Sequence, residues 1–176
     1  MQPKKMRRCV KHFTHSIASP RDICCQLSTA QGMDTMADQV KDACEACFDE
    51  HANDCSGFAR AVSDQLGVQL QGLANEIVDI IRGGNDWTPL RNGAAAAQSA
   101  AAGNLVIGGL KGSEQTHPDQ HGHVVVVVAG PLDPTHHAYP KAYWGKLGGR
   151  GDKNQWTNWA WNEGDRDRVS YAAHEI

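Results

Sequence analysis

The spacing of apolar residues changes at Gly103, and this change constrains the fold more than any other feature of the chain. Before Gly103, apolar side chains recur three and four residues apart, as on the buried face of a helix. The first such stripe joins Met36, Val40 and Cys44, and later stretches end at glycine, a residue typical of helix ends. Helices are predicted at residues 36–50, 56–66, 73–81 and 94–102.

After Gly103, short β-branched runs bounded by glycine are typical of buried strands. The two clearest strands are predicted at residues 105–107 and 124–128, and weaker ones at 142–147, 155–161 and 168–173. Because the helices precede the strands, we predict an α+β fold in which N-terminal helices pack on an antiparallel sheet.

Charge separates the first 32 residues from the rest. They carry six Lys or Arg and one Asp, a net of +5, against −8 for residues 33–176. Because they also lack a clear period, we predict a poorly ordered basic extension over residues 1–32 and a single domain over residues 33–176. The net charge of −3 gives no reason to expect a nucleic-acid partner.

The sequence favours neither a membrane span nor an export signal. No apolar run approaches the roughly 20 residues that a bilayer requires. The stretch after the first basic residues is interrupted by His12, His15, Pro20 and Arg21, so we expect no signal peptide.

All six cysteines lie within the first 55 residues: Cys9, Cys24, Cys25, Cys44, Cys47 and Cys55. A secreted disulfide framework normally distributes its cysteines through the fold, so this distribution favours free thiols. Cys44 and Cys47, followed by His51, have the spacing of half a zinc knuckle, but they also fit one helix face, and core thiols are the better interpretation.

Cys55 is the cysteine with a catalytic setting. It stands where a loop ends and the second predicted helix begins, after the capping-type residues Asn53 and Asp54. The unpaired amides and the dipole of a helix start favour the reactive thiolate. The same amides, near Ser56, could receive the oxyanion of an attacked carbonyl.

A nucleophilic thiolate needs a partner that holds a proton and passes it to the leaving amine. His123 is the best candidate because it opens the most apolar predicted strand, where packing would fix its position. Gly122 leaves room beside it. A helix-borne cysteine with a strand-borne histidine is the papain-like arrangement.

Four stretches resemble the type VI secretion amidase effectors, within the papain-like cell-wall peptidases that include NlpC-type enzymes. They are 54–58 with 66–68, 105–112, 122–132 and 165–168. The resemblance runs from about residue 36 to the C-terminus. It implies a cysteine amidase catalytic domain over residues 33–176, with Cys55 as nucleophile and His123 as base, and no cofactor.

The resemblance also implies a substrate and a route. Such effectors cleave the bond between D-glutamate and meso-diaminopimelate in the stem peptide of peptidoglycan. They are made in the bacterial cytoplasm and delivered by the type VI secretion tube to the periplasm of a competitor. The expected partners are therefore a cognate immunity protein, a component of the secretion tube and the stem peptide. We expect a monomer, and we expect neither a nucleic-acid nor a membrane partner.

Two points depart from the family pattern. No cysteine follows Cys55, so a late disulfide found in some members has no counterpart here. The element that orients His123 should lie near residues 142–144, where no Asn, Asp or Gln occurs. A backbone carbonyl, Asp119 or Asp133 are the candidates.

Two alternatives remain open at the level of sequence. Asp119, His121 and His123 alternate as ligands on a strand would, which would suit a metal-dependent hydrolase. A non-catalytic cell-wall binding module is the other, with Trp87 or Trp144 walling a groove. We otherwise expect Trp156, Trp159 and Trp161 to be core and sheet residues.

Overall fold

The computed structural model describes residues 20–176, with side chains from residue 36 onward. Its helices are α1 (Pro20–His51), α2 (Cys55–Gln65), α3 (Ala74–Arg82) and α4 (Gly93–Ala101). Its strands are β1 (Thr88–Leu90), β2 (Leu105–Leu110), β3 (His123–Val127), β4 (Lys141–Trp144), β5 (Asp152–Trp156) and β6 (Ser170–His174). Short 3-10 turns lie at Gly112–Glu114, Thr157–Trp159 and Arg166–Arg168.

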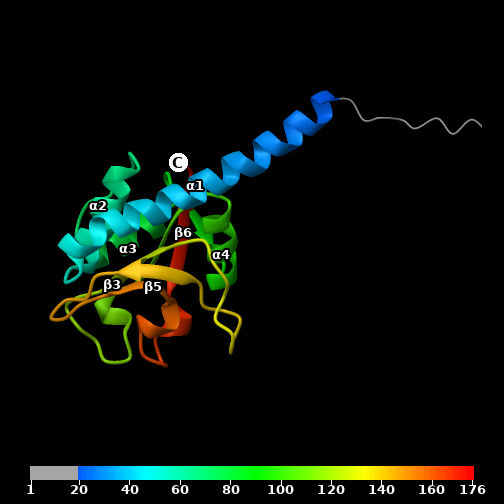
Figure 1. Cartoon of the computed structure of the whole chain (residues 1–176). Coiled ribbons are helices and arrows are strands. Elements are labelled where there is room, and N and C mark those ends of the chain that lie inside the picture. Colours follow the sequence, from blue (N-terminus) through cyan, green and yellow to red (C-terminus); the bar gives the residue numbers. More distant parts are fainter. Residues whose placement is uncertain (1–19) are drawn as a thin grey trace, which may run out of the picture.

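Six strands of the described chain form one antiparallel sheet in the order β1-β6-β2-β3-β4-β5. In the pairing of β2 with β3, Val106 lies opposite Val127 and Leu110 lies opposite His123. The fold is α+β, with helices packed on an antiparallel sheet, and it is consistent with the predicted papain-like architecture (Figure 1).

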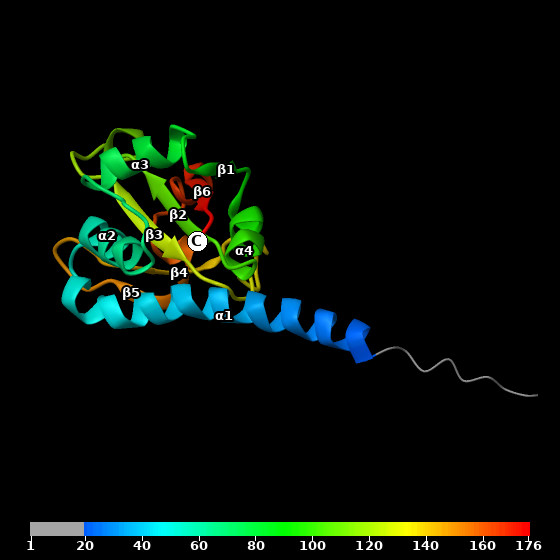
Figure 2. The ribbon, with the colours of Figure 1, turned by 90° about the horizontal axis from the view of Figure 1, so that it is seen from above.

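The two faces of the sheet bury different helices, because successive side chains of a strand point to opposite faces. Val124 and Val126 of β3 belong to the core that α1, α2 and α3 form. Val125 and Val127 belong to a second core, to which α4 contributes Ala96 and Ala100. Figure 2 shows α1 beside α2 along one part of its length and beside α4 along another. β3 contributes side chains to both cores, so packing on both faces of the sheet holds it in place.

The predicted helices are confirmed, with one difference at the N-terminus. The helix expected at residues 36–50 is the last part of α1, which begins at Pro20, and its first part projects past the domain (Figure 1). Proline suits the first turn of a helix, and helix formers such as Leu27 and Ala30 continue the pattern upstream. Residues 20–32 are therefore helical rather than poorly ordered, and residues 1–19 lie outside the described residues.

The strand predictions are confirmed for β2, β3 and β6. The predictions for the two strands between β3 and β6 were less accurate. β5 spans Asp152–Trp156, whereas a strand was expected at residues 155–161. The chain turns at Thr157–Trp159 instead, and Trp159 is 69% exposed, so its prediction as a core residue was wrong. β1 was missed because it is a three-residue edge strand that contains a proline.

No helix in the described part of the chain is both long and apolar enough to cross a membrane.

Candidate active site

Cys55 is the first residue of α2, and the cap before it fixes its position. The carboxylate of Asp54 accepts a hydrogen bond from the backbone N–H of Gly57 at 3.0 Å and another from the Ser56 hydroxyl at 3.0 Å. This satisfies one of the amides that a helix start leaves unpaired. Gly57 is required here, because a Cβ at this position would lie 2.4 Å from Asp54 Oδ2. The cap therefore depends on the Asp-Cys-Ser-Gly order of the sequence.

Cys55 and His123 line the same pocket, of about 270 Å³, which we call the Cys55 pocket. Its wall also includes Leu73, Asn75 and Leu147, from segments far apart in the sequence. Cys55 is 6% exposed, and His123 is half-buried at the start of β3. The structure thus brings the two predicted catalytic residues together across the contact of α2 with the sheet.

The thiol and the imidazole form no hydrogen bond with each other in this structure. The backbone N–H of Val124, the residue after His123, approaches the sulfur instead. The edge of the His123 ring packs against Trp161, with ring centroids 5.2 Å apart and planes at 68°. In enzymes without bound substrate, catalytic hydrogen bonds are often long, and they tighten when substrate binds.

The electrostatics favour a neutral pair. Burial raises the pKa of the Cys55 thiol, and the charge of Asp54 adds to this, while backbone N–H groups of Val124, Ser56 and Cys55 act in the opposite direction. Burial, followed by the positive charge of Lys146, lowers the pKa of His123 to about 4. The helix start was expected to favour the thiolate, but desolvation of the sulfur outweighs it. At neutral pH the site therefore holds a thiol beside a neutral imidazole.

Comparison with known proteins gives the family. No protein-family model matches the chain. The chain is 36% identical over 155 residues to the peptidoglycan amidase Tse1 of Pseudomonas aeruginosa, and the match covers 82% of this chain and 94% of that protein. The chain belongs to the type VI secretion amidase effector family. The α+β fold is thus that of an amidase effector.

The predicted substrate-binding residues of this amidase effector divide into two groups. Asp54, Ser56 and Gly122 line the Cys55 pocket. The Asp54 carboxylate and the Ser56 hydroxyl are bonded to each other, so their side chains maintain the cap. Asn53 is exposed in the turn before α2 and lies outside the pocket.

Gly122 is needed for close packing beside His123. A Cβ there would lie 2.6 Å from Asn75 Oδ1 and 2.9 Å from the carbonyl oxygen of Leu110. Asn75 donates to the carbonyl of Gln120 at 2.8 Å and accepts from the Gly112 N–H at 3.0 Å. It thereby ties α3 to the segment that leads into β3. Sequence reasoning missed Asn75, because only the fold brings it to this segment.

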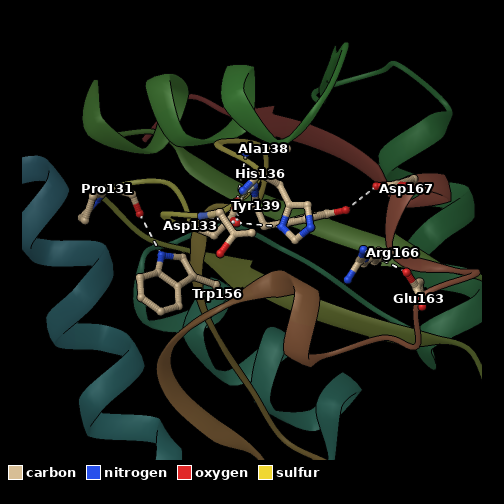
Figure 3. Close-up of polar contacts among 10 residues, drawn as sticks. Pro131, Asp133, His136, Ala138, Tyr139, Trp156, Glu163, Arg166 and Asp167 are labelled. Atoms are coloured by element: carbon tan, nitrogen blue, oxygen red, sulfur yellow. Dashed lines mark hydrogen bonds and ion pairs between the residues drawn. The ribbon is translucent and has the colours of Figure 1, made fainter.

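Asp133 does not orient His123 in this effector. Its buried carboxylate accepts from the backbone N–H groups of His136, Ala138 and Tyr139, and from the His136 ring at 3.0 Å (Figure 3). Burial acts to raise the pKa of Asp133, but these hydrogen bonds hold it well below its ordinary value. The carboxylate is fully occupied with its own loop, so this candidate is wrong.

Asp119 is the remaining carboxylate candidate. Its carboxylate accepts from the backbone N–H groups of Gln120 and His121 rather than from an imidazole. The contact that restrains His123 in the structure is Trp161, which is 8% exposed. Trp161 was predicted as a core residue, and that prediction is confirmed.

The metal-site alternative has no ligand set in the described part of the chain. No three His, Cys, Asp or Glu side chains described there, Asp119, His121 and His123 included, are placed to hold an ion. Cys44 is fully buried in the core, and Cys47 donates to Gln65 Oε1 at 3.2 Å. The prediction of core thiols is confirmed for Cys44, whereas Cys47 is half-buried and packs against that core.

A second pocket, of about 340 Å³, adjoins the Cys55 pocket at His123, and we call it the Lys146 pocket. His121, Gly122, His123 and Leu147 line both pockets, which makes them neighbours. Lys146, Asp152, Trp144 and Trp159 also line it. Trp144 touches this pocket but is only 1% exposed, and Trp87 is buried against His174, so neither forms the exposed groove wall that one alternative expected.

Sequence reasoning missed the rim of these pockets. Three of the four large hydrophobic side chains found exposed in the described chain are Leu73, Leu147 and Trp159, and all three line one or both pockets. Exposed apolar side chains gathered at a hollow mark a binding surface. Their gathering depends on loops, so the periodicity of the sequence carried no signal for it.

Proposed function

We propose that this effector is a cysteine amidase that hydrolyses the bond between D-glutamate and meso-diaminopimelate in peptidoglycan stem peptides. Cys55 is the nucleophile and His123 the general base. The observation that carries the proposal is the shared pocket of Cys55, at the start of α2, and His123, at the start of β3. Membership of the family and the name of the relative, a peptidoglycan amidase, support the substrate class. The choice of bond rests on the resemblance described above.

The neutral pair sets the first step. As Sγ of Cys55 attacks the carbonyl carbon of D-glutamate, the neutral imidazole of His123 takes the thiol proton. A low pKa of His123 keeps the imidazole unprotonated and ready for this step. The backbone N–H groups at the start of α2 face the developing oxyanion, and the helix dipole adds to its stabilisation.

The second half of the cycle returns the site to its starting state. The imidazolium of His123 gives its proton to the leaving nitrogen, the C–N bond breaks, and a thioester remains on Cys55. Water then attacks the thioester carbonyl while His123 accepts a proton from it. The thiolate of Cys55 leaves and is reprotonated, and the D-glutamyl carboxylate is released.

The biological setting is part of the same proposal. The protein is made in the bacterial cytoplasm and reaches the periplasm of a recipient cell through the type VI secretion tube, where it degrades the wall. A cognate immunity protein protects the producing cell. Residues 33–176 form the catalytic domain.

Digestion of purified Gram-negative sacculi tests this function. Wild type, Cys55→Ala and His123→Ala are incubated with sacculi, and the released fragments are identified by mass spectrometry. We expect wild type to produce new D-glutamyl and diaminopimelyl ends, and neither variant to do so. Cys47→Ala is the matched control, because it removes a half-buried thiol outside the Cys55 pocket.

Cleavage by Cys55→Ala at the wild-type rate would refute the nucleophile. Cleavage by wild type at a different bond would refute the choice of bond. The activities of Cys55→Ala and His123→Ala would still test the Cys-His assignment. Circular dichroism of each variant verifies that it is folded.

A further inference from the structure

The side chain of Lys146 has no anionic partner among the residues whose side chains are described. Its backbone N–H donates to the carbonyl of Ala52 at 3.0 Å, which fixes this residue beside the turn that precedes α2. The side chain is exposed in the Lys146 pocket and takes part in none of the ion pairs among the described residues. By contrast, Lys153 pairs with Glu45 at 2.8 Å. The chain thus holds one charged ammonium beside His123 without neutralising it.

The pocket around Lys146 offers apolar walls and charges of both signs. Leu147 and Trp159 are 66% and 69% exposed at its rim. Three carboxylates also line it. Asp119 and Asp152 do not pair with Lys146, and the buried Asp165 pairs with Arg168. The indole Nε1 of Trp161, another lining residue, is buried and has no hydrogen-bond partner among the described residues. Buried donors usually have partners, so an unpaired donor at a pocket marks a place for a ligand oxygen.

The direction of the reaction decides which half of the substrate reaches this pocket. His123 must give a proton to the leaving nitrogen, so that nitrogen lies next to the imidazole. The acyl half remains on Cys55, in the Cys55 pocket. The atoms attached to the leaving nitrogen therefore extend past His123, where the Lys146 pocket begins.

We propose that the Lys146 pocket binds the leaving half of the substrate and that Lys146 selects a leaving half with a free carboxylate. Because Asp152 lies in the same pocket, a group with both a carboxylate and an ammonium fits better than a lone anion. A charge-assisted hydrogen bond from an ammonium to a carboxylate is stronger than one to a neutral amide. This inference rests on the proposed function, since it requires an amide bond cut between the two pockets.

Two synthetic stem peptides test the selection. They are identical except that the distal carboxylate of diaminopimelate is free in one and a carboxamide in the other, so the amino group is present in both. The value of kcat/KM is measured for wild type, Lys146→Gln and Lys41→Gln. Lys41 is the matched control, because it is an exposed lysine on α1 outside both pockets.

We expect wild type and Lys41→Gln to prefer the free carboxylate by about tenfold or more, as the loss of a charge-assisted bond implies. Lys146→Gln should cleave both peptides with a ratio near one, with its effect mainly in KM. If both peptides are cleaved, two results would overturn this inference. One is a wild type with equal kcat/KM for the two peptides, and the other is a Lys146→Gln variant that keeps the wild-type ratio of kcat/KM. Failure of wild type to cleave either peptide would overturn the proposed function and this inference with it.

Discussion

Two regions of this molecule combine acidic residues and histidines, and they differ in how their polar atoms are used. In the loop around Asp133, the carboxylate is saturated by backbone N–H groups and by the His136 ring (Figure 3). Around His123, the imidazole has a packing contact with Trp161 and no hydrogen bond in the described chain. A saturated cluster fixes a loop, whereas an unsaturated one beside a pocket is available to a substrate.

The largest difference is expected between the two histidines. Replacing His123 with alanine should lower kcat/KM by roughly 10³-fold or more, because the site loses the base that accepts the thiol proton. His136→Ala should leave kcat/KM within about threefold of wild type, since the His136 ring bonds Asp133 and lines neither pocket. The measurement is the rate of release of a stem-peptide product. Equal losses in the two variants would remove the distinction between the regions.

The two aspartates should differ in stability. Asp133→Ala leaves several buried N–H groups without an acceptor and should lower the free energy of unfolding by about 3 kcal/mol or more. Asp119→Ala affects an exposed loop and should cost about 1 kcal/mol or less. Urea denaturation followed by circular dichroism compares them. A loss for Asp119→Ala as large as that for Asp133→Ala would show that hydrogen-bond saturation does not mark the scaffold.

Trp161 tests whether packing alone orients His123. Trp161→Ala should lower kcat by about tenfold, because a ring that loses its neighbour spends less time in a reactive orientation, and should raise KM because the indole N–H is lost. Trp161→Phe keeps an aromatic edge and should retain most of kcat, with a raised KM. An equal loss in both variants would assign the effect to the indole N–H instead of the packing contact.

The smallest effect is expected on the dependence of activity on pH. Because the pKa of His123 lies at about 4 and that of the Cys55 thiol is raised, neither group changes charge near neutrality. Activity should rise as pH increases through about 4 and should then vary less than about twofold between pH 6 and 8. The profile of kcat/KM on a soluble stem peptide gives the answer. An acidic limb with its midpoint near the ordinary pKa of histidine would show that the imidazole is not desolvated.

The elements with strong periodicity could be predicted from the sequence. Helical spacing identified α2 and α3, alanine content identified α4, and the valine run identified β3. Residues at element starts, Cys55 and His123, were found because capping and strand boundaries leave local signals. The extension of α1 to Pro20 was not anticipated, because charge and Pro content were read as a break in structure.

The remainder of the site depends on contacts distant in sequence. Asn75, Lys146, Leu147 and Trp159 reach the pockets through loops, whose positions no period encodes. The raised pKa of Cys55 also could not be predicted, because a helix start favours thiolate while burial opposes it, and only the fold gives the depth of burial. The position of Asp133 in the chain made it a candidate. Its carboxylate instead accepts hydrogen bonds from its own loop, which the sequence alone does not show.

Covalent trapping tests the central claim most directly. A stem-peptide analogue with a chloromethyl ketone in place of the scissile amide is incubated with the enzyme, and the adduct is located by mass spectrometry of its peptides. We predict one adduct, on Cys55 and not on Cys47, with loss of sacculus cleavage in proportion to labelling. Complete labelling of Cys55 while cleavage continues at the wild-type rate would contradict the account.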